Sequence, residues 1–412
     1  MNREQISRTN IYEVNLRQYT AEGTINAFLH HLPRLKDMGV ETLWFMPITP
    51  ISQKHRKGSM GSYYACSDYT AVTPEFGTLE DWKQLVHKAH AMGFYVILDW
   101  VANHTGWDHV WTEQYPDWYK KDEYTGDFKR ASGMDDIIEL DFDNAHMRRA
   151  MIDAMSFWVK ETNIDGFRCD LAFWVRLDFW QQAKQELKNL KPLFWLGELD
   201  VLENPEYMEV FDAAYTWRWM HKAEKYYKGE AGFSELKSLL HDYQQSPGLK
   251  AWFTANHDEN TWNGTEYEKY GDLAAALMVF SCTWPGLPLI YSGQELPNRK
   301  RLQFFEKDVI AWSDKAALHS FFKTLLTLRS ENTALSADAP VELLAVDSES
   351  VLAFHRSEDV LVLINFSDLP VQFSLSEITG AYRDVFSHQQ FFFSKDHTLH
   401  LSPRGYLLLA KA

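Results

Sequence analysis

The run Ile164-Asp165-Gly166-Phe167-Arg168-Cys169-Asp170 is a short strand-like segment that ends on an acidic residue. Segments of this kind are typical of buried parallel strands, which do not alternate regularly between apolar and polar positions. Because the carboxyl ends of parallel strands meet on one side of a sheet, further runs that end in the same way predict one shared active site. Three such runs are Asp99-Trp100-Val101-Ala102-Asn103-His104, Trp195-Leu196-Gly197-Glu198 and Phe253-Thr254-Ala255-Asn256-His257-Asp258.

Eight strand-like segments alternate along the chain with amphipathic helical patterns. Eight repeats of this kind predict an α/β protein, a (β/α)8 TIM barrel with helices outside a ring of parallel strands. The strand-like segments are Asn10–Asn15, Thr42–Pro47, Tyr95–Val101, Ile164–Asp170, Leu193–Glu198, Ala213–Trp217, Ala251–Asn256 and Pro288–Ser292. The helical patterns include Leu79–Met92, Ala145–Thr162, Leu177–Leu190, Asp272–Thr283 and Lys315–Arg329.

Two parts of the chain depart from this alternation. Residues 105–144 form a long aromatic and polar connection after the third strand, and a loop of that length inside a compact domain is usually functional. We therefore predict a barrel over residues 1–104 and 145–335, a short excursion domain over 105–144 and a C-terminal antiparallel β-sandwich over 336–412. The C-terminal module is predicted from short alternating segments at Val341–Ala345, Val351–His355, Val360–Asn365 and Tyr406–Ala410.

Composition and charge restrict the class of partner. The chain has 412 residues, 45% hydrophobic and 24% charged, and its net charge of −16 would repel a nucleic acid or an anionic membrane surface. No apolar run reaches the ~18 residues of a membrane span. The first residues lack the apolar core of a signal peptide, and three cysteines give no disulfide framework. We expect a cytoplasmic protein with a neutral substrate; its oligomeric state is unknown.

The acids at the strand ends have the chemistry of a glycosidase. Arg168 and Asp170 stand two apart on one strand and face the same side, and the guanidinium favours the ionised carboxylate that a nucleophile requires. Glu198 follows an apolar run, and an apolar setting suits a general acid because it favours the protonated carboxyl. The two predict a retaining pair about 5–5.5 Å apart. Asp258, with His257 before it, would hold substrate hydroxyls.

These runs resemble the sequence regions of the α-amylase family, glycoside hydrolase family 13, over most of the chain. The resemblance implies that Asp170 is the nucleophile, Glu198 the acid/base and Asp258 the stabiliser of the transition state. It also implies sugar contacts at the cleaved bond from Arg168, His104 and His257, with Tyr64 stacked under that sugar. Further likeness to the family lies in Gly39–Ile48, Pro74–Thr78 and Tyr291–Glu295.

Other positions resemble particular members of this family. Where many α-amylases have Lys-His after the nucleophile strand, this chain has Phe173 and Trp174, which makes the acceptor side of the site aromatic. With Asp178-Phe179-Trp180, the tract resembles cyclomaltodextrinases and intracellular maltodextrin hydrolases. Trp262, near another strand end, is a further candidate for sugar contact, although an aromatic residue in such a place is about as often part of the packing.

The resemblance implies no required cofactor. Calcium-binding members of the family use the Asn of the Asn-His pair, here Asn103, and an Asp whose nearest match is Glu139. Ca²⁺ takes six to eight oxygen ligands, and the sequence supplies two candidates. Calcium is therefore left as an alternative to a site without metal.

Together, the motifs and the resemblance predict retaining hydrolysis of α-1,4-glucosidic bonds. The expected substrate is an oligo- or polysaccharide α-glucan such as maltodextrin or starch. Two alternatives stand beside it. A transglycosylase of the 4-α-glucanotransferase type would use a sugar hydroxyl in place of water, which the aromatic acceptor side favours. A non-catalytic carbohydrate-binding scaffold is expected to have lost one of the three acids, and all three are present. For Asp99, inside its strand, we expect a structural role.

Overall fold

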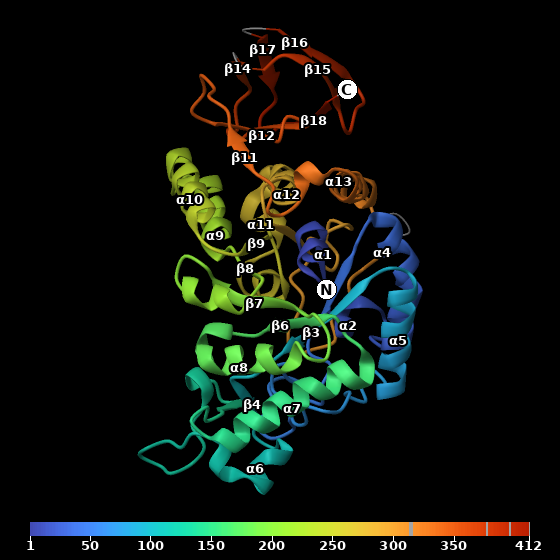
Figure 1. The fold of residues 1–412 in the computed structure, drawn as a ribbon, viewed down its shortest axis with the longest axis vertical. Helices are drawn as coiled ribbons and strands as arrows, with labels where there is room; N and C mark the ends of the chain where they lie inside the picture. Colours follow the sequence, from blue (N-terminus) through green and yellow to red (C-terminus); the bar gives the residue numbers. More distant parts are fainter. Residues whose placement is uncertain (313–315, 376–377, 395–396, 412) are drawn as a thin grey trace.

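The centre of the molecule is a closed barrel of eight parallel strands with helices around it (Figure 1). The computed structural model describes residues 1–312, 316–375, 378–394 and 397–411. Around the ring the strands follow the order β1-β10-β9-β8-β7-β6-β3-β2, which confirms the predicted barrel. Their bounds are β1 Ile11–Val14, β2 Thr42–Phe45, β3 Tyr95–Trp100, β6 Gly166–Cys169, β7 Phe194–Asp200, β8 Ala213–Tyr215, β9 Leu249–Trp252 and β10 Leu287–Tyr291.

The barrel strands are buried along nearly their whole length, as expected of a parallel sheet covered on both faces. Close packing explains the glycine that begins β6. A Cβ on Gly166 would lie 2.0 Å from the carbonyl oxygen of Phe194 on the neighbouring strand. Glycine thus lets β6, which Asp170 follows, and β7, which contains Glu198, approach each other closely.

Two strands differ from their predicted bounds in a way that matters for the site. β9 ends at Trp252, so the segment that leads to Asp258 lies beyond the sheet. β7 continues to Asp200, and its register against β8 shifts between Gly197 and Asp200. Glu198 therefore lies in a β-bulge and not at a simple strand end. Bulges redirect a side chain locally and are frequent beside active sites.

The helices lie outside the barrel (Figure 1). Four predicted helical patterns form helices, which differ by up to three residues at one end. Lys315, the predicted start of the last helix, lies outside the described residues. The bounds are α1 Arg3–Arg8, α2 Leu16–Tyr19, α3 Ile25–Phe28, α4 Leu32–Met38, α5 Leu79–Ala91, α6 Val110–Gln114, α7 Ala145–Thr162, α8 Leu177–Leu187, α9 Trp217–Tyr227, α10 Phe233–Gln245, α11 Glu266–Tyr270, α12 Ala274–Thr283 and α13 His319–Glu331.

The excursion after β3 carries a small antiparallel sheet. β4 (His104–Gly106) pairs with β5 (Ile137–Glu139), and α6 lies between them along the chain. In Figure 1 this part lies at the end of the molecule opposite the C-terminal strands. The division of the chain into three domains at residues 104, 144 and 335 stays a prediction.

The C-terminal region consists of two antiparallel sheets, as the predicted sandwich requires. A six-stranded sheet has the order β11-β12-β13-β18-β15-β16, and β14 pairs with β17. The sequence predicted four of these strands and missed the four from β14 to β17. The bounds are β11 Val341–Leu343, β12 Val351–Arg356, β13 Val360–Asn365, β14 Val371–Leu375, β15 Gly380–Asp384, β16 Gln390–Phe393, β17 His397–Leu401 and β18 Tyr406–Lys411.

Strand β13 shows how the C-terminal region is held to the barrel. Val360, Val362 and Ile364 pack into the core shared with the barrel, whereas Leu361 and Leu363 pack into a second core between the two sheets. This alternation is the period-two pattern of a strand with an apolar environment on each face.

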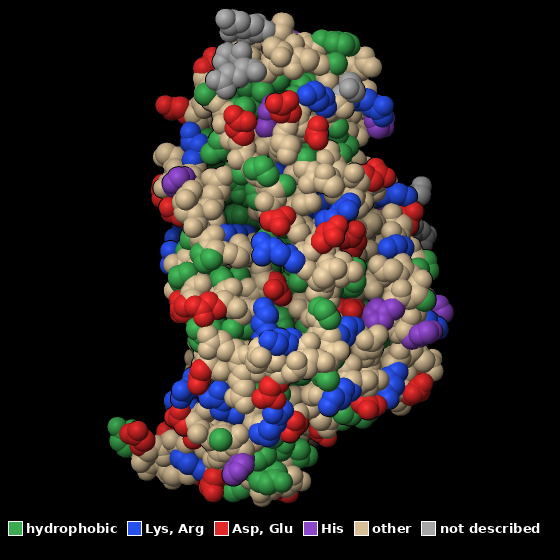
Figure 2. Space-filling view, in the orientation of Figure 1, with side chains coloured by type: hydrophobic (Ala, Val, Ile, Leu, Met, Phe, Trp, Pro, Cys, Tyr) green, Lys and Arg blue, Asp and Glu red, His purple; other side chains and the backbone are tan. Residues whose placement is uncertain are grey.

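Charged side chains of both signs are interspersed over the face shown in Figure 2. In the described part of the chain, no helix has the length and apolar character needed to cross a membrane.

Candidate active site

The three acids predicted for catalysis lie at the carboxyl side of the barrel. Asp170 directly follows β6, Glu198 lies in the bulged part of β7, and Asp258 follows β9 after five intervening residues. This is the side on which barrel enzymes carry their active groups. Asp170 and Glu198 are 6% and 3% exposed, so both carboxyl groups are largely withdrawn from solvent.

A fully buried arginine joins three carboxyl groups. Arg168 Nη1 donates to Asp170 Oδ1 at 3.1 Å and to Asp99 Oδ1 at 3.0 Å. Its Nη2 lies 2.8 Å from Glu198 Oε2, an ion pair without the alignment of a hydrogen bond. One positive charge therefore faces three acids, which leaves an excess of negative charge unless two of them hold protons.

The resulting electrostatics correct one expectation from the sequence. The pKa of Asp170 is raised well above its usual range by burial and by the charge of Glu198, and the opposing effect of Arg168 does not compensate. Burial likewise raises the pKa of Asp99 to about 6, against the lowering effect of Arg168. The predicted depression of the Asp170 pKa was therefore wrong. The site therefore favours the protonated form of Asp170 up to a higher pH than an exposed aspartate would allow.

The residue after the predicted nucleophile has an unusual backbone conformation. Leu171 adopts the left-handed region with φ 39°, which is costly for a residue with a branched side chain. In this conformation its N–H donates to Glu198 Oε2 at 2.7 Å. The turn after β6 therefore connects the backbone beside Asp170 to the Glu198 carboxylate.

His257 is the centre of a second group of polar contacts. Its Nδ1 lies 2.5 Å from Glu13 Oε1, and its Nε2 lies 2.8 Å from Tyr64 Oη and 3.3 Å from Asp258 Oδ2. Burial lowers the pKa of His257, but the charges of Asp258 and Glu13 and the bond to Glu13 outweigh it and raise the pKa to about 9. His257 is accordingly a cation at neutral pH, with both ring nitrogens as donors.

Tyr64 connects the two groups. Its hydroxyl donates to Asp99 Oδ2 at 3.1 Å and accepts from His257 Nε2. Its ring is stacked beside the His257 ring, with centroids 5.4 Å apart. The structure thus brings Tyr64, Arg168, His257 and the acids predicted for catalysis into one continuous network.

His104 also lies beside this network, at the start of β4. It is 2% exposed, its Nδ1 lies 3.3 Å from the Asn103 side-chain amide, and its Nε2 has no partner in the described structure. Burial lowers its pKa to about 4, so the ring is neutral at pH 7. Because this buried nitrogen has no protein partner, it is available to form a hydrogen bond with a sugar hydroxyl.

The three remaining candidates are aromatic side chains at the edge of the site. Phe173 and Trp174 lie on the turn after β6, and Trp174 is 38% exposed. Trp262, 52% exposed, lies on one turn of π-helix over Glu259–Asn263, and its Nε1 donates to Asp258 Oδ1 at 3.2 Å. A π-turn is rare and is frequently found at functional sites.

Three further residues orient this network; sequence reasoning missed Glu13 and Tyr215 and gave Asp99 a structural role without naming its contacts. Asp99 holds Arg168 and Tyr64, Glu13 holds His257, and the Tyr215 hydroxyl accepts from Arg168 Nε at 3.2 Å. Both acids carried a recognisable signal, a single charge inside an otherwise apolar barrel strand. Tyr215 carried none, because a tyrosine in a strand is usually part of the core.

The candidate calcium ligands do not form a cation site. Glu139 faces two ammonium groups, Lys120 Nζ at 2.5 Å and Lys129 Nζ at 3.0 Å, so its charge is already neutralised. The side chain of Asn103 contacts His104. No cluster of three or more His, Cys, Asp or Glu side chains suited to a metal ion occurs among the residues that the structure describes. These residues do not fit calcium.

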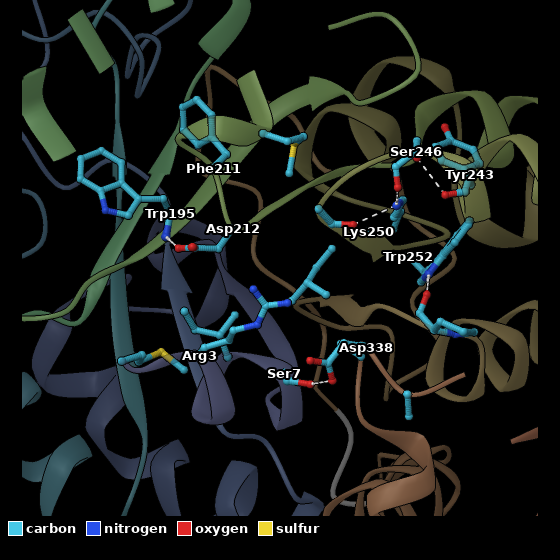
Figure 3. Close-up of a pocket in the computed structure, with 18 of the residues that line it drawn as sticks. Arg3, Ser7, Trp195, Phe211, Asp212, Tyr243, Ser246, Lys250, Trp252 and Asp338 are labelled. Atoms are coloured by element: carbon cyan, nitrogen blue, oxygen red, sulfur yellow. Dashed lines mark hydrogen bonds between the residues drawn. The ribbon is translucent and has the colours of Figure 1, made fainter. Parts of the chain in front are cut away.

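A cavity of about 930 Å³ lies at the other end of the barrel (Figure 3). Leu193, Asp212 and Pro285, which line it, come just before β7, β8 and β10, and Arg3 of α1 lies among them. None of the three acids lines this cavity. Because barrel enzymes place their chemistry at the carboxyl ends of strands, the network around Arg168 and not this cavity is the candidate active site.

The alpha-amylase catalytic-domain model matches this chain over residues 8–129 and 116–316. The chain belongs to the α-amylase family. Among relatives, α-amylase MalA of Haloarcula japonica is 27% identical over 417 residues, covering 90% of this chain and 58% of that protein. A cyclomaltodextrinase of Geobacillus thermopakistaniensis is 26% identical, covering 84% of this chain and 62% of that enzyme. The chain therefore spans about three fifths of the length of these two relatives.

A solved structure in the family matches over its whole length. The noncanonic maltogenic α-amylase AmyB of Thermotoga neapolitana has a TM-score of 0.90 at 27% identity, covering 99% of this chain and 100% of that one. The barrel with a C-terminal antiparallel region is thus the α-amylase fold.

Proposed function

We propose that this α-amylase family member hydrolyses α-1,4-glucosidic bonds of maltodextrins or starch with retention of configuration. The observation that carries the proposal is the pair Asp170 and Glu198, buried at the carboxyl side of adjacent strands and held by one guanidinium. Retaining glycosidases require such a pair, one group ionised for attack and the other protonated for donation.

In the first step Glu198 protonates the glycosidic oxygen while Asp170 attacks the anomeric carbon. The contacts of Glu198 with Arg168 and with the Leu171 N–H both use Oε2, which leaves Oε1 to carry the transferable proton. Arg168 holds Asp170 by Oδ1 and leaves Oδ2 to form the bond to the sugar. The bond to the leaving sugar breaks as the glycosyl-enzyme bond forms.

In the second step water hydrolyses the glycosyl-enzyme. Glu198, now a carboxylate, takes a proton from the water, whose oxygen attacks the anomeric carbon and releases Asp170. The protonated and ionised forms of the pair are thereby restored. Arg168 stays charged throughout and stabilises whichever carboxylate is ionised.

Asp258 and its neighbours would bind the sugar and stabilise the positive charge that develops on it. Asp258 is held by His257 and Trp262, and its side chain is 43% exposed, so it is accessible to a substrate. The His257 cation and the neutral His104 offer donors and an acceptor to sugar hydroxyls, and Tyr64 offers a ring face. Phe173, Trp174 and Trp262 would contact further sugars.

The test is a product profile with time on maltoheptaose, pullulan and soluble starch, followed by chromatography. Short maltooligosaccharides from the linear substrates support the hydrolase. Products longer than the starting chain would show the transglycosylase instead, and binding without any turnover would show a scaffold. The relatives described above carry the names of hydrolases, which favours the first outcome.

We also propose that the enzyme acts in the cytoplasm and requires no calcium. Its three cysteines are free and buried, which suits a reducing compartment.

For calcium, the test is the activity that remains after chelation. A loss of activity that added Ca²⁺ restores would contradict the proposal.

A further inference from the structure

One segment outside the catalytic network joins two sides of the site. Residues 53–60, here called the belt, follow β2 and contact the excursion. Two backbone N–H groups of the belt donate to Asp108 Oδ2 at 2.8 and 3.1 Å. Further along, Lys57 forms an ion pair of 2.7 Å with the buried Asp136. One end of the belt is thereby fixed to the excursion.

The other end of the belt is fixed to the segment that follows β10. The Met60 N–H donates to the Phe305 carbonyl at 3.0 Å, and the Ser59 N–H donates to Glu306 Oε1 at 2.9 Å. The two segments touch so closely that a Cβ on Gly58 would lie 2.6 Å from Phe305 Cβ. The belt therefore runs without a break from the excursion to the β10 segment.

A buried arginine contacts both the belt and the segment after β10 at the place where they meet, here called the junction. Arg17, 0% exposed, forms a two-point ion pair with Glu75 at 2.7 and 2.9 Å. Its remaining donors reach the carbonyls of Met60, Gly61 and Phe304 at 2.9 to 3.3 Å. Because one planar, fully buried guanidinium holds both segments, the junction is a fixed part of the structure.

The junction lies where sugars on one side of the cleaved bond would extend. The rings of Tyr64 and Phe304 lie 6.1 Å apart with planes at 19°, and Phe304 lies 5.1 Å from Phe305. The aromatic surface that begins at Tyr64 therefore continues for one more ring and then meets the belt. β2 and β10 flank β1 in the ring, whereas β6, which precedes the exposed Trp174, lies two strands beyond β2.

We propose that the belt closes the donor side of the site beyond the second sugar. The enzyme would then act from the non-reducing end and release products of at most two glucose units, while the longer part of the chain leaves past Phe173 and Trp174. This inference rests on the proposed function and adds to it the mode of attack and the product size.

The experiment uses the intact protein and maltoheptaose carrying deuterium at carbon 1 of its reducing end. Early products are separated, and mass spectrometry gives the length of each product and whether it carries deuterium. The proposal predicts that deuterium appears first only in chains shorter than the substrate by one or two sugars. Deuterated products of many lengths at the earliest times would overturn it. If the proposed function itself is wrong, either no chain is cleaved or products longer than maltoheptaose appear, and both outcomes differ from these results.

A double variant, Lys57→Ala with Glu306→Ala, removes side-chain ties at both ends of the belt and touches no catalytic group. We expect at least a tenfold rise in the share of products longer than two units among those without deuterium, which come from the non-reducing end. The matched control is Lys83→Ala with Glu161→Ala, an exposed ion pair of 2.9 Å between α5 and α7, and it should leave the pattern unchanged. An unchanged pattern in the folded double variant would contradict the role of the belt. If that variant does not fold, the wild-type pattern still decides whether the donor side is closed.

Discussion

At the scale of single residues, burial dominates the chemistry of the site. Arg168 faces three carboxyl groups in a region closed to solvent, and burial together with the charge of Glu198 raises the pKa of Asp170 in spite of the guanidinium. The identity of the three acids was readable from the sequence because each follows a strand-like run. The raised pKa of Asp170 was not, since it depends on burial and on charges that come from other strands, Glu198 first and Asp99 to a smaller extent.

The first prediction concerns the nucleophile. Asp170→Asn keeps the size of the side chain but removes the attacking carboxylate, so kcat should fall on the order of 10⁴-fold or more. Steady-state assays on maltoheptaose, with circular dichroism to verify the fold, provide the measurement. Asp178→Asn makes the same change at an exposed position eight residues on and should keep most of the activity. Near-wild-type turnover in Asp170→Asn would refute the assignment.

A second prediction concerns the Glu13–His257 pair. His257 is charged below its pKa of about 9 and neutral above it, so a site that uses the cation loses activity as pH rises through about 9. Glu13→Gln removes a negative charge 2.5 Å from the ring and lowers that pKa. The alkaline limb of kcat/KM should therefore move roughly one unit or more towards neutral pH. An unmoved limb would mean that His257 is not the titrating group.

At the scale of elements, local sequence patterns predict the strands of the barrel, whereas the exact ends and irregularities of those strands depend on packing against their neighbours. All eight strands were predictable because parallel strands need apolar residues on both faces. The bulge in β7 and the early end of β9 were not, because each depends on what neighbouring elements allow. The strands β14 to β17 were missed because their exposed faces are polar and their segments are short, which resembles loop sequence.

The contact between β6 and β7 gives a prediction about stability. Gly166→Ala would place a methyl group 2.0 Å from the Phe194 carbonyl oxygen, and the strands would have to separate. The free energy of unfolding should fall by about 1–3 kcal/mol, as in other overpacked sites. Denaturant titration measures it. In Gly232→Ala the nearest atom is 3.6 Å away, so the loss should stay within about 1 kcal/mol. Equal effects of the two substitutions would contradict the packing argument.

At the scale of the whole molecule, the barrel and the C-terminal sheets share one core. Phe354 of β12 packs against Trp284, which follows α12, with ring centroids 5.0 Å apart. Beside them the fully buried Arg356 donates to the Thr283 carbonyl at the end of α12 and to three carbonyls of the segment that leads from the barrel into the sheets. The C-terminal region is therefore part of the folding unit and not an appended module.

This shared core predicts the effect of Arg356→Met. The substitution leaves one buried and three partly buried carbonyl contacts without their donor, so the free energy of unfolding should fall by about 2 kcal/mol. Thermal and denaturant unfolding provide the measurement. Arg383→Met removes an exposed arginine from the same sheet and should have little effect. If Arg356→Met were as stable as the wild type, the contact between barrel and sheets would contribute little.

The central claim, that Asp170 and Glu198 act as a retaining pair, is tested most directly by the configuration of the first product. Proton NMR spectra recorded during the first minutes of maltoheptaose hydrolysis distinguish the two anomers of the newly formed reducing end before they interconvert. The double displacement predicts that the α-anomer appears first and that the β-anomer follows by mutarotation. The β-anomer appearing first would show single displacement and would contradict the account.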